Sequence, residues 1–184
     1  MNQQRFKRSL FGDPVEFSLE SRMFHGVSLI ISLTLFFKAL FYSFTSLELG
    51  AVVCGIAGVM ELGNYYLSRF QKKVKLAITL CATKLSLIMI LIYLYNGGLG
   101  GNMLLLSAIS LFLIILIIPK NQHFFWLLLN MGIVFTMMAL EYVYPTIVKQ
   151  HYLSRTEAFL DLGVTYANVA LLLFVGISIF RRSF

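Results

Sequence analysis

The stretch "LLLSAISLFLIILIIP", residues Leu104–Pro119, decides the fold class of this chain. It holds no charged residue, and it lacks the alternation of apolar and polar residues that membrane β-strands show. Similar apolar runs recur along nearly the whole sequence, close to the ~20 residues with which a helix crosses ~30 Å of hydrocarbon. We therefore expect an all-α, polytopic membrane protein.

The composition points to the same class. The 184 residues are 59% hydrophobic and 12% charged, whereas soluble domains carry roughly 25% charged residues. Cys54 and Cys81 lie inside apolar runs, where a free thiol behaves as a small hydrophobe. The net charge of +7 does not indicate a nucleic-acid partner, because the charges gather at the ends of the apolar runs. The expected partner is the lipid bilayer.

Six membrane spans are expected, at residues 25–46, 48–68, 74–95, 102–119, 123–144 and 160–180. The positive-inside rule sets their orientation. With both termini inside, eleven of the fifteen Lys and Arg residues fall in cytoplasmic segments, and only Lys149 and Arg155 fall in outer loops. The remaining two, Lys38 and Lys84, fall within spans. The predicted topology is N-in and C-in, which in a bacterium places the chain in the inner membrane.

The domain organisation follows from these spans. Residues 1–24 form a cytoplasmic N-terminal segment, 25–180 the six-helix transmembrane domain, and 181–184 the start of a cytoplasmic connection. The sequence "DPVE", Asp13–Glu16, is typical of a helix start. It predicts a short interfacial helix before the first span, whose apolar side chains face lipid: Val15, Phe17, Leu19 and Met23. A capping box of Ser154 and Glu157 precedes the last span.

The glycine-rich stretch "NGGLGG", Asn96–Gly101, joins the third and fourth spans on the outer side. It lacks the lysine and the spacing of a nucleotide-binding P-loop. Its glycines supply positive φ angles and a very short chain reversal. A turn is therefore the favoured interpretation, and contact with a ligand is secondary.

Charged residues inside spans are costly, so each needs a partner or a function. Glu61 and Lys84 lie on adjacent spans at similar depth, and they form a candidate intramembrane ion pair. Lys38 is placed to extend outward toward Glu48. The alternative is that such pairs only fix how the helices pack.

A candidate ligand site lies where the fifth span meets its outer loop. The sequence gathers polar and aromatic side chains there, and it predicts a pocket formed by Asn96, Glu141, Tyr142, Arg155 and Asp161. The alternative is an ordinary interfacial belt of aromatic residues. The sequence has no HExxH, no paired cysteines and no GxSxG, so neither a metal site, nor another cofactor, nor a catalytic residue is predicted.

Seven stretches taken together resemble the multi-pass N-terminal sensor region of a family of membrane histidine kinases found in Bacteroidota. They are "SLESRMFHGVSL", "YYLSRF", "NGGLGG", "PKNQHFFWLLLN", "LEYVYP", "FLDLGVTY" and "FRRSF". The resemblance implies a homodimer and a last span that continues into a cytoplasmic kinase of a two-component system. The chain stops at Phe184 without a phosphoacceptor helix or ATP-binding boxes, so we expect a sensor domain with no kinase activity of its own.

Three functions stay open at this stage. The leading hypothesis is a sensor that relays an outer-face ligand or a membrane signal through the last helix. The alternative is a small six-helix transporter or a substrate-binding membrane subunit. Against transport, no span is interrupted at mid-depth by proline or paired glycines. The third is a membrane anchor without a ligand.

Overall fold

The computed structural model describes residues 16–45, 48–149, 152 and 154–183. Over these residues the chain is all-helical, as the sequence predicts. Its α-helices are α2 (Leu19–Ser43), α3 (Glu48–Arg69), α4 (Val74–Tyr95), α5 (Met103–Ile117), α6 (His123–Val143) and α7 (Arg155–Ser183). Three short 3-10 helices lie in the connections: η1 (Gly98–Gly100), η2 (Lys120–Gln122) and η3 (Pro145–Ile147).

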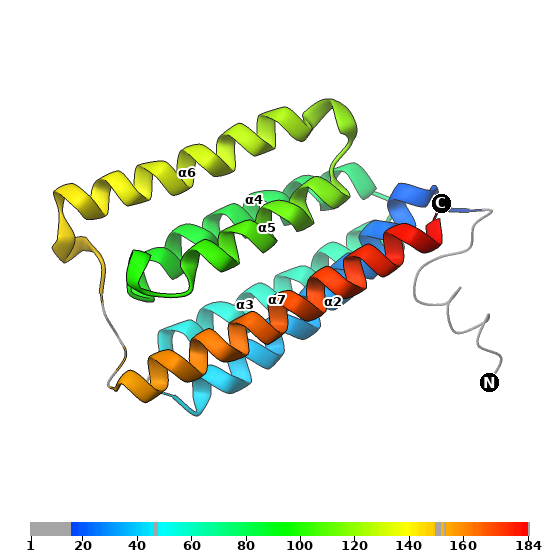
Figure 1. Cartoon of the computed structure of the whole chain (residues 1–184). Coiled ribbons are helices and arrows are strands. Elements are labelled where there is room, and N and C mark those ends of the chain that lie inside the picture. Colours follow the sequence, from blue (N-terminus) through cyan, green and yellow to red (C-terminus); the bar gives the residue numbers. More distant parts are fainter. Residues whose placement is uncertain (1–15, 46–47, 150–151, 153, 184) are drawn as a thin grey trace.

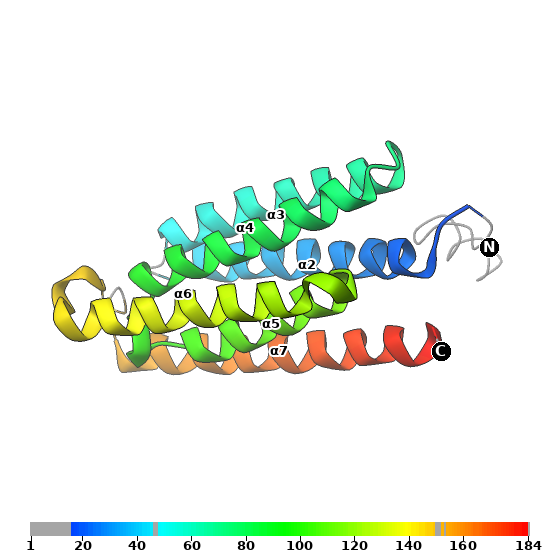
Figure 2. The same cartoon turned by 90° about the horizontal axis from the view of Figure 1, so that it is seen from above.

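The six helices run side by side in one elongated bundle (Figure 1). The start of α2, the end of α7 and the α3–α4 and α5–α6 turns lie at one end, which we call the terminal end. The opposite end carries η1, η3 and the start of α7, and we call it the glycine-loop end. Seen from above, α3 and α4 lie on one side of the bundle and α7 on the opposite side (Figure 2).

Four segments are long and apolar enough to cross a membrane: Glu20–Ser43, Val74–Tyr95, Lys120–Val143 and Arg155–Ser178. They correspond to α2, α4, α6 and α7. Helix α5 is apolar but has only 15 residues. Helix α3 is of spanning length but carries polar side chains along its buried face, Glu61 and Asn64 among them.

The core lies between α2, α4, α5 and α7, where apolar side chains such as Phe24, Ile31, Cys81 and Ile114 are buried. Gly58 of α3 brings that helix close to α2, because a Cβ there would lie 3.1 Å from the Phe36 ring. Helix α6 packs least. Only 11% of its most apolar stretch is buried inside the protein, against 56% for α4. Its exposed face is apolar, as a lipid-facing helix requires.

The N-terminal region differs in part from the sequence prediction. Helix α2 begins at Leu19 and runs without a break to Ser43, and Ser18 caps it by accepting a hydrogen bond from Ser21 N at 3.3 Å. The predicted lipid-facing orientation of Phe17 and Met23 is wrong, because both side chains are buried in the protein. The Phe17 ring contacts the His25 ring and the Arg69 guanidinium, which hold it inward. Asp13 and Val15 lie outside the described residues.

The predicted helix ends fit the structure more closely. Ser154 Oγ accepts a hydrogen bond from Glu157 N at 3.2 Å, so Ser154 caps α7 as predicted. The stretch Asn96–Gly101 forms the predicted tight reversal around η1, with positive φ at Gly97 (78°) and Gly98 (53°). Helix α7 begins at Arg155, five residues before the predicted span.

Candidate functional site

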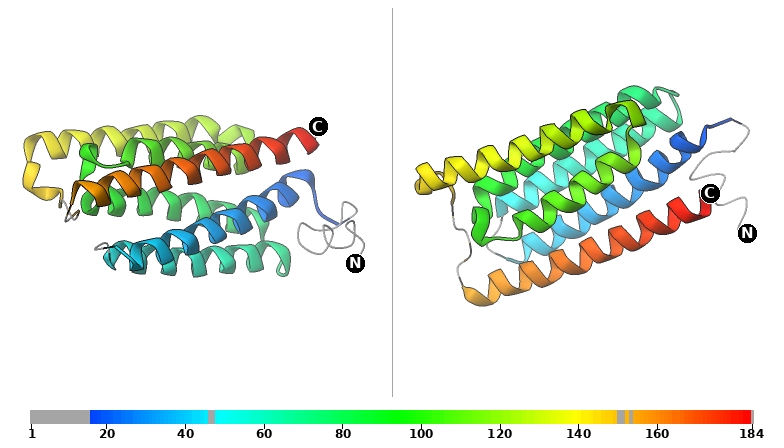
Figure 3. Two further views of the ribbon diagram at one scale, coloured as in Figure 1. Left: turned by 60° about the horizontal axis from the view of Figure 1, so that its bottom comes forward. Right: turned by 45° about the horizontal axis from the view of Figure 1, so that its top comes forward.

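A buried network of polar side chains connects α7 to the rest of the bundle near the glycine-loop end. We call it the Asp161 cluster. It comprises Lys38, Tyr42, Asn96, Asn102, Tyr152, Asp161 and Thr165. Its members come from α2, from the segment before α7, from α7 itself, and from the two ends of the connection between α4 and α5. We call that connection, residues 96–102, the glycine loop. In the right-hand view of Figure 3, α7 runs along one edge of the bundle beside α2.

An ion pair forms the centre of this cluster. Lys38 Nζ lies 2.7 Å from Asp161 Oδ1, and the two residues are only 6% and 1% exposed. Lys38 Nζ also donates to Thr165 Oγ1 at 2.5 Å and to Tyr42 Oη at 3.2 Å. A charge taken out of water is tolerated only when it is paired and hydrogen-bonded. The ammonium group of Lys38 meets that condition with three acceptors.

The second oxygen of the Asp161 carboxylate is also satisfied. Asn102 Nδ2 donates to Asp161 Oδ2 at 2.6 Å, and Tyr152 Oη donates to the same oxygen at 2.7 Å. Burial, and then the nearby Asp161 carboxylate, raise the pKa of Tyr152. The Tyr152 hydroxyl therefore keeps its proton at neutral pH and remains a donor. Asp161 thus joins α7 to α2, to the glycine loop and to the segment preceding α7.

The predicted partner of Lys38 is wrong. The sequence places Lys38 toward Glu48, but Glu48 is exposed at the start of α3. Because α2 and α7 pack together in the fold, the four-residue spacing of Asp161 and Thr165 turns both side chains toward Lys38. A buried ammonium group is stabilised more by a buried carboxylate than by an exposed one.

The structure brings together only part of the predicted ligand site. Asn96 and Asp161 belong to the same cluster, connected through Tyr42 and Lys38. The Tyr142 side chain is exposed, with 87% of its surface accessible. Arg155 is also exposed, at the first turn of α7.

Glu141 makes a different set of contacts. Its carboxylate accepts hydrogen bonds from Tyr93 Oη and, at 3.1 Å, from Leu99 N. The carboxylate packs directly on Gly98, where a Cβ would collide with it. Glu141 therefore holds the glycine loop on α6. No hydrogen bond described for Glu141 reaches the Asp161 cluster.

A second buried network lies nearer the terminal end. Lys84 Nζ of α4 forms an ion pair with Glu61 Oε2 of α3, so the pair considered from the sequence is present in the structure. Ser28 Oγ donates to Glu61 Oε1 at 2.5 Å, and Asn64 Nδ2 donates to Glu61 Oε2 at 3.3 Å. Glu61 is fully buried. This Glu61 cluster fastens α2, α3 and α4 to one another.

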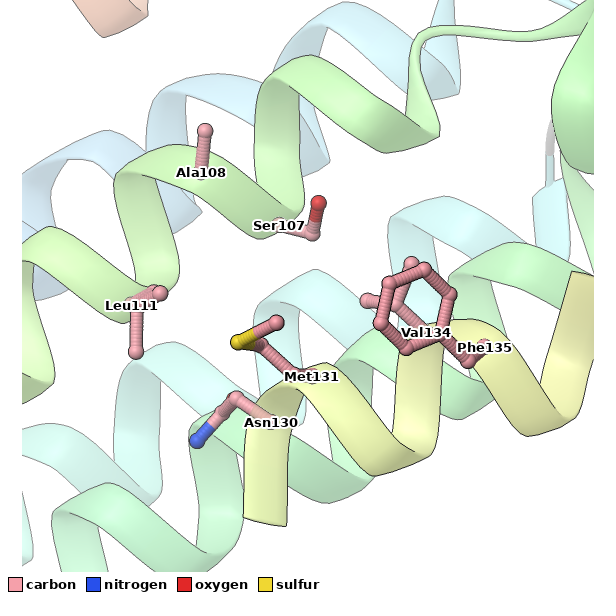
Figure 4. Close-up of a pocket in the computed structure, with 7 residues that line it drawn as sticks. All are labelled: Ser107, Ala108, Leu111, Asn130, Met131, Val134 and Phe135. Atoms are coloured by element: carbon pink, nitrogen blue, oxygen red, sulfur yellow. The ribbon is translucent and has the colours of Figure 1, made fainter. Parts of the chain in front are cut away.

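A shallow hollow of about 160 Å³ lies between α5 and α6 (Figure 4). Seven residues line it: Ser107, Ala108, Leu111, Asn130, Met131, Val134 and Phe135. The amide group of Asn130 is bonded inside the protein, because its Nδ2 donates to Trp126 O at 2.9 Å. This hollow therefore offers a ligand few polar contacts.

Sequence reasoning missed Tyr42, Asn102, Tyr152 and Thr165. A usable signal existed for two of them, because Tyr42 follows Lys38 by four residues and Thr165 follows Asp161 by four. Side chains at that spacing share one helix face. Asn102 and Tyr152 lie outside the helices, where no such periodicity applies.

The described residues contain no group of three or more His, Cys, Asp or Glu side chains that could hold a metal ion. Comparisons with protein-family models, with curated proteins and with solved structures found no match to this chain. Its function is therefore inferred from its own residues.

Proposed function

We propose that this chain is the membrane-embedded input domain of a signalling protein, in which α7 carries the signal to the cytoplasm. The observation that carries the proposal is the Asp161 cluster. It joins the first turns of α7 to α2 and to the glycine loop through one carboxylate. A change at the glycine-loop end that alters these bonds acts directly on α7.

The dimensions of α7 support this role. The helix has 29 residues, which corresponds to ~43 Å at ~1.5 Å per residue. This exceeds the ~30 Å of a bilayer core, so α7 is long enough to extend beyond the membrane. Asn168 in the middle of α7 has a buried Nδ2 with no partner among the described residues. A buried amide donor without a partner costs free energy, and a shift of α7 that gives it a partner would recover part of that cost.

We further propose that all six helices cross the membrane, with both termini in the cytoplasm of a bacterial inner membrane. Successive helices alternate in direction along the bundle. The charge of Glu61 does not prevent α3 from spanning, because Lys84 pairs with it inside the protein. Helix α5 is short, but Leu113, Ile114 and Ile117 bury it among its neighbours. The basic residues Arg69, Lys72 and Lys73 lie at the terminal end, as the positive-inside rule requires.

The resemblance to sensor histidine kinases suggests the output of such a domain. We propose that α7 leads into a dimeric kinase and that a ligand or a membrane change shifts the chain between two states. Such a shift requires that the signal bind one state better than the other. Sequencing the gene beyond the codon for Phe184 tests this extension. A helix with a phosphoacceptor histidine is the expected finding, and an immediate stop codon contradicts it.

The functional test replaces Asp161 in the longer native protein, or in a fusion of the chain to the cytoplasmic half of a dimeric histidine kinase. Asp161→Asn removes the charge that faces Lys38, and we expect autophosphorylation in membrane vesicles to change. Tyr166→Phe is the control, because it removes a polar group from an exposed side chain of the same helix, and 66% of Tyr166 is accessible. Equal phosphorylation by the two variants would refute the role of the cluster.

Transport is the second candidate function. The two ion pairs buried in the bundle favour it, because ionisable residues inside membranes also mark ion and proton paths. Reconstitution of the chain in proteoliposomes tests it. A proton flux that Lys38→Met abolishes would support transport and displace the signalling proposal.

A further inference from the structure

A hollow of about 170 Å³ borders the Asp161 cluster between α2, α3 and α4. Its walls are mostly apolar, with Leu49 and Val53 from α3 and Leu91 from α4. Tyr42, Tyr95 and Asn96 also line it, and Tyr42 and Asn96 belong to the cluster. A dry apolar cavity of ~150 Å³ in another protein accommodates benzene. This hollow therefore has room for a molecule of that size.

Two of the polar side chains that line the hollow, Tyr42 and Asn96, have hydrogen-bonding capacity left. Tyr42 Oη accepts from Lys38 Nζ and from Asn96 Nδ2, each at 3.2 Å. Its own proton reaches no acceptor among the described residues, and Asn96 Oδ1 receives no hydrogen bond from them. One donor and one acceptor therefore stand unused beside the hollow. A hydroxyl group satisfies both, because it accepts one hydrogen bond and donates another.

The hollow is open to molecules dissolved in lipid. A larger hollow of about 380 Å³ runs between α3 and α4 and shares Val53 and Leu91 with the first. Leu49 and Leu91 are 47% and 42% exposed, so the rim lies on the apolar outer surface of this helix pair. A ligand that partitions into the bilayer can enter along this surface.

We propose that the hollow binds a benzene-sized apolar molecule carrying one hydroxyl group, of the phenol class. The ligand oxygen accepts the Tyr42 proton, and the ligand hydroxyl donates to Asn96 Oδ1. Binding changes the hydrogen bonds of Tyr42, which bonds Lys38, which in turn pairs with Asp161 on α7. The transmission to α7 rests on the proposed signalling function, whereas the binding itself does not.

The binding test uses the whole chain in lipid nanodiscs and follows 4-fluorophenol by ¹⁹F NMR. Val53→Phe fills the hollow, and Val52→Phe adds the same ring at a neighbouring position that faces outward, where Val52 is 57% exposed. We expect saturable, one-to-one binding to the unaltered chain and to V52F, and none to V53F. Leu91→Phe is the second filling variant if V53F does not fold. Equal binding by the filling and control variants, or no saturable binding at all, would overturn the site.

Tyr42→Phe tests the hydroxyl contact, with fluorobenzene as the probe that lacks a hydroxyl. We expect Y42F to weaken 4-fluorophenol binding roughly 3- to 10-fold, the effect of one lost hydrogen bond. Fluorobenzene binding should not change. Equal loss for both probes would overturn the assigned polar contacts. Saturable binding that leaves kinase output unchanged would contradict the proposed signalling function while leaving the binding site established.

Discussion

Replacing Asp161 with asparagine tests how strongly the Asp161 cluster holds α7. The substitution keeps the size of the side chain and removes its charge. Asp161 Oδ2 accepts from Asn102 and Tyr152, while Oδ1 faces Lys38. An asparagine presents one oxygen and one NH₂ group. In either orientation of the amide, its NH₂ group therefore faces donors: Lys38 on one side, or Asn102 and Tyr152 on the other.

The expected cost follows from these contacts. At least two hydrogen bonds to a charged group are weakened or lost, at about 1.5–3 kcal/mol each. An independent estimate comes from buried ion pairs in general, where removal of one partner destabilises the fold by about 3–5 kcal/mol. Lys38 is only 6% exposed, so water cannot replace the lost carboxylate without opening the bundle. We therefore expect D161N to lower the free energy of unfolding by about 3–5 kcal/mol.

Reversible unfolding in mixed detergent micelles, followed by circular dichroism, measures this loss. The chain supplies its own control, an ion pair on the surface between Lys72 Nζ and Glu16 Oε1. The two atoms lie 2.7 Å apart, the same distance as in the Lys38–Asp161 pair. Their side chains are 65% and 48% exposed, so Glu16→Gln should cost at most about 1 kcal/mol.

A double-mutant cycle separates the interaction energy between Lys38 and Asp161 from the contacts that each residue makes with its other neighbours. Lys38→Met together with D161N should cost less than the sum of the single variants, by about 1–3 kcal/mol. If D161N costs no more than E16Q, or if the costs of the two buried substitutions simply add, then burial does not give this ion pair its strength.

Three further predictions follow from other contacts. Gly98→Ala should destabilise the fold by about 1–3 kcal/mol, because the φ of 53° and the nearby Glu141 carboxylate disfavour a Cβ at this position. Gly100→Ala is the control in the same unfolding assay and should have little effect, because a Cβ there meets nothing within 4 Å. Lys84→Met should greatly reduce the yield of folded protein because it leaves the buried Glu61 unpaired, and a second substitution, Glu61→Gln, should recover part of that yield in size-exclusion chromatography. A membrane-impermeant thiol reagent added to intact cells should label Leu99→Cys, which the proposed topology places outside, and not Gln71→Cys, which it places in the cytoplasm. The two native cysteines are buried and should give little background. Labelling of Gln71→Cys would contradict the proposed topology.

The helices were predictable from the sequence because apolar runs mark them and several of these runs end at a clear signal. The run before Pro119 gives α5, which ends at Ile117, and Ser154 marks the start of α7. The turn at Gly97 and Gly98 was predictable for the same local reason, since glycine adopts positive φ without strain. Local signals therefore located the elements and their ends.

The partners of buried charges were less predictable. Glu61 and Lys84 lie on consecutive helices, where similar depth implies contact. Lys38 and Asp161 are separated by 123 residues, and their contact depends on α2 lying beside α7. The arrangement of helices in a bundle results from the packing of many side chains, which periodicity along one chain does not encode. For the same reason, the sequence did not indicate that Phe17 and Met23 turn inward.

The central claim is that the Asp161 cluster holds α7 against the bundle, and a distance measurement tests it most directly. Spin labels at Phe124→Cys on α6 and Ile177→Cys on α7 occupy exposed positions toward the terminal end, far along α7 from Asp161. Electron–electron double resonance in nanodiscs then reports the separation of the two helices. We predict that D161N shifts or broadens the distance distribution, while Tyr166→Phe at an exposed position of the same helix leaves it unchanged. Identical distributions for D161N and the unaltered chain would contradict the claim.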